Sequence, residues 1–167
     1  MAETARTRPD NLLVFGLATF HVTLLTTTGL FVLHSSGSIG RLLAGLDTLT
    51  GFALFLALWA STWWTTRWVL TRAPLNPENS DSRLRSAMLW GYLGGAVTGI
   101  VFLPVAFVLV FLFTFGVAVL ANLASFIVLV FGIPVAAIVG GLVGTAFGLF
   151  DFCIYRVASS FVPKRRA

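Results

Sequence analysis

Charged side chains are scarce in this sequence. Asp, Glu, Lys and Arg make up 10% of its 167 residues, whereas 57% are hydrophobic. Soluble domains are about 25% charged, so a water-soluble globular fold is excluded. A disordered chain is excluded as well, because so much apolar surface does not stay hydrated. The mean hydropathy of +0.95 therefore predicts an integral membrane protein.

Cysteine is almost absent, since Cys153 is the only one in the chain. One cysteine cannot form an intramolecular disulfide, and no cluster of Cys and His residues has the spacing of a metal site. The sequence motifs of zinc proteases, serine hydrolases and P-loop proteins are also missing. We therefore expect no metal, no cofactor and no enzymatic activity.

Four apolar segments make up most of the chain. A membrane-spanning helix needs about 20 apolar residues, which predicts spans at about 12–33, 42–64, 87–117 and 122–155. We expect an all-α membrane protein, a four-transmembrane-helix bundle of two antiparallel hairpins. This multi-pass domain would cover residues 11–158, between a polar segment, 1–10, and a basic tail, 159–167.

The basic residues predict the orientation of these helices. Arginines precede the first span and populate the hydrophilic loop 65–86, and the chain ends in a basic tail, whereas only Arg41 lies between the first two spans. Cytoplasmic loops are rich in Lys and Arg, so both termini and the central loop are expected on the cytoplasmic side of the plasma membrane. We expect the basic residues to contact anionic lipids of the bilayer rather than nucleic acid.

The stretch from Ser86 to Phe150 contains no charged residue and is longer than two ordinary spans. Three arrangements fit this length. Two long helices kinked at Pro104 and Pro134 would meet at a turn near residues 116–122. Alternatively, the prolines would divide the stretch into three spans, or one segment would enter the membrane and return. The charge pattern disfavours three spans, because they would move the basic tail outside.

Glycines recur at every fourth position in both halves of this stretch, which places each set on one helix face. In an antiparallel hairpin the two sets are symmetric about a point between Val119 and Leu120. Small residues let helix backbones approach closely in lipid, so the two faces are predicted either to pack on each other or to pack on another helix or protomer. The first set is Gly91, Gly95 and Gly99, and the second is Gly140, Gly144 and Gly148.

Ionisable groups inside a membrane are functional candidates because charge in hydrocarbon is unfavourable. His21 lies near the middle of the first span, Thr28 follows two turns later on the same face, and Asp47 lies near the outer end of the second span. These three residues are candidates for an ion or solute path. For His21 the alternative is a neutral imidazole bonded to a neighbouring helix, and for Asp47 it is a hydrated or Arg41-paired carboxylate. Asp151 is expected to form a salt bridge with Arg85 or Arg156.

Two functions fit these observations. The first is a non-catalytic subunit or accessory component that assembles with itself or with a larger membrane protein through its glycine faces. The second is a small oligomeric transporter or channel for an ion or small solute. The missing deep acidic residue argues against the second function, because it leaves no group to couple an ion.

Overall fold

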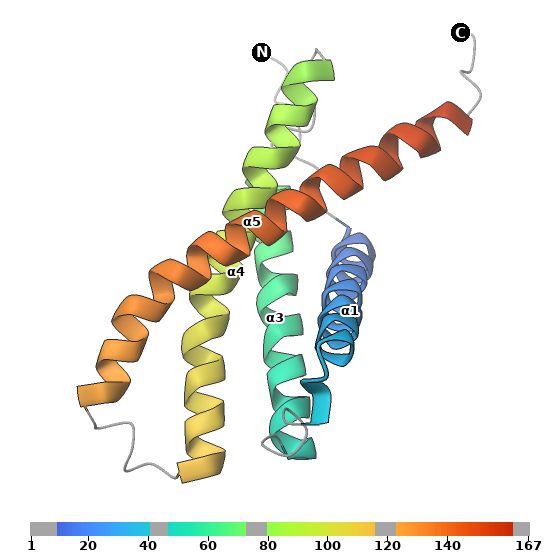
Figure 1. The fold of residues 1–167 in the computed structure, drawn as a ribbon. Helices are drawn as coiled ribbons and strands as arrows, with labels where there is room; N and C mark the ends of the chain where they lie inside the picture. Colours follow the sequence, from blue (N-terminus) through green and yellow to red (C-terminus); the bar gives the residue numbers. More distant parts are fainter. Residues whose placement is uncertain (1–9, 41–46, 73–79, 116–122, 162–167) are drawn as a thin grey trace, which may run out of the picture.

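The computed structural model describes residues 10–40, 47–72, 80–115 and 123–161 (Figure 1). In these residues the protein is all-helical. Successive helices run in opposite directions, so that α1 begins and α5 ends at the same end of the molecule, the upper end in Figure 1. Helix α3 packs between α1 and α4, and α5 makes its main contact with α4. The helices are α1 (Asn11–Ser35), α3 (Thr48–Arg72), α4 (Ser80–Phe115) and α5 (Leu123–Phe161).

Three of the described helices are long and apolar enough to cross a membrane. Their apolar segments are Asn11–Ser35 in α1, Leu84–Leu112 in α4 and Phe126–Ile154 in α5. Helix α3 is of similar length to α1, with 25 residues, but contains many Thr and Trp residues. Three candidate spans indicate a multi-pass membrane protein, in agreement with the composition.

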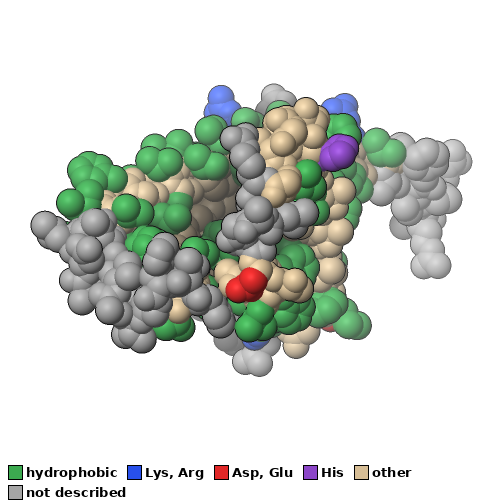
Figure 2. Space-filling view, turned by 60° about the horizontal axis from the view of Figure 1, so that its bottom comes forward, with side chains coloured by type: hydrophobic (Ala, Val, Ile, Leu, Met, Phe, Trp, Pro, Cys, Tyr) green, Lys and Arg blue, Asp and Glu red, His purple; other side chains and the backbone are tan. Residues whose placement is uncertain are grey.

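Polarity in this structure is inverted relative to a soluble protein. Large apolar side chains are exposed on every described helix, as Leu12 and Phe131 illustrate at 78% and 71% exposure, whereas Thr50, Ser61 and Thr65 are buried. Figure 2, which looks at the lower end of Figure 1, shows hydrophobic side chains over much of the described surface and basic ones only at its margins. Hydrocarbon solvates apolar surface as well as the protein interior does, so polar groups turn inward instead.

Both ends of α1 have recognisable capping residues. The carboxylate of Asp10 accepts a hydrogen bond from the backbone N–H of Leu12 at 3.0 Å. At the other end Gly37 adopts a φ of 68°, which is the left-handed conformation that glycine adopts without a steric penalty. The N–H of Ser38 then bonds the carbonyl of Leu33 at 2.9 Å. These local signals end α1 before residues 41–46, which lie outside the described structure.

Helices α4 and α5 touch through their glycines. A Cβ atom built on Gly95 would lie 2.8 Å from the Cα of Gly144, and one built on Gly91 would lie 3.3 Å from the Cα of Gly148. One built on Gly140 would lie 3.4 Å from the Cα of Gly99. The two glycine sets therefore pack on each other. Each Cβ position lies closest to a backbone carbonyl one turn away from its symmetry partner, as Gly95 lies against the carbonyl of Gly140. No side chain fits between the backbones here, so the close contact requires glycine on both helices.

Both prolines lie inside continuous helices, Pro104 in α4 and Pro134 in α5. Of the three arrangements expected for residues 86–150, the described residues form two long helices, and the expected turn at 116–122 lies outside them. Leu103 and Gly132, which neighbour the two prolines, lie next to each other across the hairpin. The prolines therefore sit at nearly equal depth.

The helices continue beyond the predicted membrane spans. Helix α3 continues to Arg72 and α4 already begins at Ser80, within the expected cytoplasmic loop 65–86, and α5 continues to Phe161. Hydropathy measures where a helix leaves the bilayer, whereas backbone hydrogen bonds continue the helix into water. Arginine stacking favours the extension of α3, since Arg67 lies over Trp63 and Arg72 over Trp68, each one turn later.

The glycine contact predicts opposite effects for two identical substitutions. Gly95→Ala places a methyl group against the backbone of α5 and is expected to lower the stability by about 1–3 kcal/mol, as overpacking does. Gly29→Ala meets no atom within 4 Å and is expected to leave stability unchanged or raise it, because alanine favours the helix. Thermal unfolding of both variants in detergent measures the difference, and equal effects would contradict the contact.

A second prediction concerns Asp47, which lies just before α3 and caps it. The backbone N–H of Thr50 donates to its carboxylate at 2.6 Å, and this bond lowers the pKa of Asp47 below the ordinary value of 3.8. A lowered pKa means that the stabilisation is complete above pH 3.8 and is lost as the pH falls through the folded-state value.

Hydrogen exchange of the Thr50 amide between about pH 5 and about pH 2 measures this loss after correction for the intrinsic exchange rate. Asp47→Asn keeps an acceptor for the cap but does not titrate. The protection in this variant is therefore expected to be independent of pH. An equal loss of protection in the variant at low pH would show that another group is responsible.

Candidate functional site

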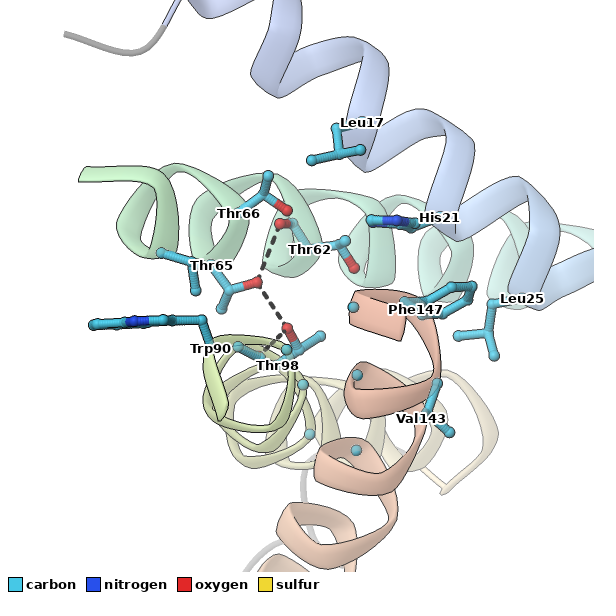
Figure 3. A pocket seen from close by; sticks show the side chains of 18 of the residues that line it. Leu17, His21, Leu25, Thr62, Thr65, Thr66, Trp90, Thr98, Val143 and Phe147 are labelled. Atoms are coloured by element: carbon cyan, nitrogen blue, oxygen red, sulfur yellow. Dashed lines mark hydrogen bonds between the residues drawn. The ribbon is translucent and has the colours of Figure 1, made fainter. Parts of the chain in front are cut away.

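A cavity of about 740 Å³ lies between the helices, and all four contribute to its wall. It forms because α5 crosses α4 obliquely (Figure 1). Helices α4 and α5 meet at their glycines. The cavity is the space that remains between this contact on one side and helices α1 and α3 on the other. Figure 3 shows α1 and α3 on one side of the cavity and α4 and α5 on the other.

An imidazole and a carboxylate meet at this cavity. Nε2 of His21, in the middle of α1, lies 3.2 Å from each of the two carboxylate oxygens of Asp151, in α5. The His21 side chain is 13% exposed and that of Asp151 is 36% exposed. Both residues line the cavity, so a molecule in the cavity can reach the pair. The pair also links α1 and α5, which make few other contacts.

Aromatic rings surround the pair. The ring of Phe147 lies 4.7 Å from the imidazole of His21, measured between centroids, and Phe20 stacks on Phe150 at 6.1 Å. These residues flank His21 and Asp151 in α1 and α5, so the aromatic contacts hold the two helices together beside the polar pair. Apolar surroundings strengthen electrostatic interactions compared with water.

Threonine hydroxyls form a polar wall opposite the pair. Oγ1 of Thr65 in α3 lies 2.7 Å from Oγ1 of Thr98 in α4. Thr65 also lies 2.9 Å from the carbonyl of Ser61, and Thr98 lies 2.8 Å from that of Gly94. Two hydroxyls have only two protons to donate, so both protons are used within the protein. The Thr65–Thr98 pair therefore joins α3 to α4.

The structure does not join the three residues of the expected path. His21 lines the cavity, but Thr28 is exposed and lies outside its wall, and Asp47 caps α3. The reason is the position of the cavity along the bundle. It lies beside the first half of α1 and the second half of α3, whereas Thr28 and Asp47 belong to the opposite halves. The grouping of these three residues is therefore corrected to His21 and Asp151.

The expected partner of Asp151 is also corrected. Arg85 was expected to form a salt bridge with it, but in the described residues the ion-pair partner of Asp151 is His21, and Arg85 is exposed. The expectation used depth in the membrane alone. Depth defines a plane, but the direction in which a side chain leaves its helix decides which residue in that plane it meets.

Sequence analysis missed the threonine wall, although a signal for it exists. Ser61, Thr62, Thr65 and Thr66 recur at the spacing of one helix face, and three of them line the cavity. The spacing alone did not reveal Thr98 as the partner on α4. The pairing of His21 with Asp151 has no local signal, because 130 residues separate them.

The His21–Asp151 contact predicts a non-additive pair of substitutions. His21→Leu leaves the carboxylate without its partner and is expected to destabilise the protein by about 1–3 kcal/mol. Adding Asp151→Leu is expected to restore part of this loss, because both polar groups are then absent from the apolar interior. Unfolding in a denaturing detergent measures the free energies.

Thr28→Val is the matched control on α1, since Thr28 is exposed to the surroundings. This substitution is expected to change the stability by less than about 0.5 kcal/mol. Additive losses in the double variant would show that His21 and Asp151 do not interact.

Comparison with known proteins places the chain in one family. A family model described as "Family of unknown function (DUF7965)" matches residues 10–167. No curated protein and no solved structure matches the sequence. Because the family model spans the four described helices and the segments between them, this chain belongs to the DUF7965 family.

Proposed function

We propose that this protein is a four-span transporter that carries a small solute across the plasma membrane through the cavity between its helices. The observation that supports it best is the His21–Asp151 pair in the wall of that cavity. Transporters bind solutes near the middle of the membrane, at sites made by several helices. His21 lies at mid-length in α1, at such a depth.

Four crossings are part of this proposal. Helix α3 packs between α1 and α4, which are both apolar enough to span. Its 25 residues correspond to about 37 Å at 1.5 Å per residue, which exceeds the hydrocarbon thickness of about 30 Å. Its polar residues Ser61 and Thr65 are buried rather than presented to lipid. An even number of crossings then leaves both termini on one side.

The positions of the arginines support a cytoplasmic location for that side. The arginines whose side chains are described all lie toward the end where α1 begins and α5 ends. Arg72 lies over Trp68 at 4.5 Å, and Trp68 contacts Trp90 of α4 at 6.2 Å. Such a group of arginine and tryptophan suits the headgroup region and anionic lipids. The arginines concerned are Arg67, Arg72, Arg85 and Arg156.

The contact between His21 and Asp151 supports transport over an accessory role. The sequence offered no deep acidic residue to couple an ion, because Asp151 lies near the end of the last apolar segment. The contact with His21 brings Asp151 to a depth near the middle of α1. Ionisable groups inside a membrane mark ion and solute paths, which makes this pair the candidate for such a site.

Assembly with a second copy or with a larger partner stays a prediction. The glycine faces that were expected to mediate it face each other within the α4–α5 hairpin. Any assembly must therefore use another surface. For this reason the geometry favours the transporter over the accessory subunit.

Accessibility of the cavity to water from both sides of the membrane tests the proposal. Thr98→Cys places a thiol in the cavity wall, in a chain whose own Cys153 has been changed to Ser. A transporter opens its site alternately to each side. A membrane-impermeant maleimide is therefore expected to label this thiol in intact cells and in inside-out vesicles.

Ile100→Cys is the matched control. Ile100 lies two residues further along α4 at nearly the same depth, but it is 41% exposed on the outer surface and does not line the cavity. A thiol in hydrocarbon remains protonated and unreactive, so labelling is expected from neither side. Labelling of Thr98→Cys from one side only, or no better than Ile100→Cys, would contradict transport through the cavity.

A further inference from the structure

We infer that the solute is an organic cation with an apolar body, bound by the carboxylate of Asp151 and by the aromatic side chains of the cavity wall. This inference rests on the proposed function, since it names the solute class for the same cavity. Two observations lead to it: the sign of the charge in the wall and the character of the remaining wall.

Among the described residues, the wall of the cavity contains no lysine or arginine. His21 and Asp151 are the ionisable side chains among these lining residues, whereas α3 and α4 contribute hydroxyl, aromatic and aliphatic groups. Arg85 in α4 and Arg156 in α5 are exposed and outside the wall. The carboxylate of Asp151 therefore favours a cation, and an anion finds no guanidinium or ammonium group in the described wall.

The rest of the wall suits an apolar body rather than a bare ion. A volume of about 740 Å³ far exceeds that of one hydrated metal ion, and a small ion needs several oxygen ligands. Aromatic residues from α4 and α5 line the cavity, including Trp90, Phe102 and Phe147. Aromatic faces attract organic cations.

The carboxylate also compensates the charge of a bound cation. A cation that enters the cavity beside Asp151 lies next to a group of opposite charge. Without such a group an uncompensated charge would lie in the membrane interior, which is unfavourable.

Tetraphenylphosphonium and tetraphenylborate test the inference, because they have the same shape and opposite charges. Equilibrium binding of each to the detergent-purified full chain is measured near neutral pH. The phosphonium cation is expected to bind to the cavity and the borate anion is not.

Asp151→Asn removes the counter-charge and is expected to weaken binding of the cation by about tenfold or more. Asp47→Asn makes the same chemical change outside the cavity and is expected to bind as the unmodified protein does. Size-exclusion chromatography shows whether each variant keeps its fold. If Asp151→Asn does not fold, the comparison of the two ions in the unmodified protein still decides the question.

Protection of the Thr98→Cys thiol separates this inference from the proposed function. The cation is expected to slow its labelling, and the anion is not. A thiol that is labelled from both sides but protected by neither ion would overturn the cation inference and leave transport standing. Equal protection by both ions would indicate a site selective for apolar shape alone and would also overturn it. A thiol that is not labelled at all overturns the proposed function.

Discussion

The backbone contact between α4 and α5 is the constraint on which the rest of the structure depends. Lipid provides no hydrophobic drive for helix association, so helices must gain contact energy from close packing. Glycines at 91, 95 and 99 meet glycines at 140, 144 and 148 with no side chain between them. Because of this contact α5 crosses α4 obliquely. As a result α5 approaches α1 between Phe147 and Asp151. The cavity is the space that this geometry leaves.

Polar groups then divide into two kinds. The hydroxyls of Thr65 and Thr98 join α3 to α4 and satisfy each other and nearby carbonyls, so their contribution is mainly structural. His21 and Asp151 join α1 to α5, but they also border the cavity. An interaction that holds two helices and also lines the cavity can link occupancy of the cavity to the helix arrangement.

Much of the fold could be predicted because membrane solvation acts locally along the chain. The apolar segments identified four helices, and the spacing of Gly95 and Gly144 was sufficient to suggest which backbones meet. The helix ends between Arg67 and Arg85 could not be read in this way, since a helix that leaves the bilayer keeps its own hydrogen bonds. The path through Thr28 and Asp47 failed because position on one helix face does not reveal how far a cavity extends along it.

The sequence by itself determined that the chain is helical, apolar on its outside and glycine-lined within its second hairpin, because composition and four-residue spacing act within single helices. Only the tertiary structure decided that His21 meets Asp151 across 130 residues, and that Thr65 finds Thr98. Such pairings depend on the crossing direction and rotation of whole helices. Those quantities arise from the sum of all interhelical contacts, and no local pattern contains them.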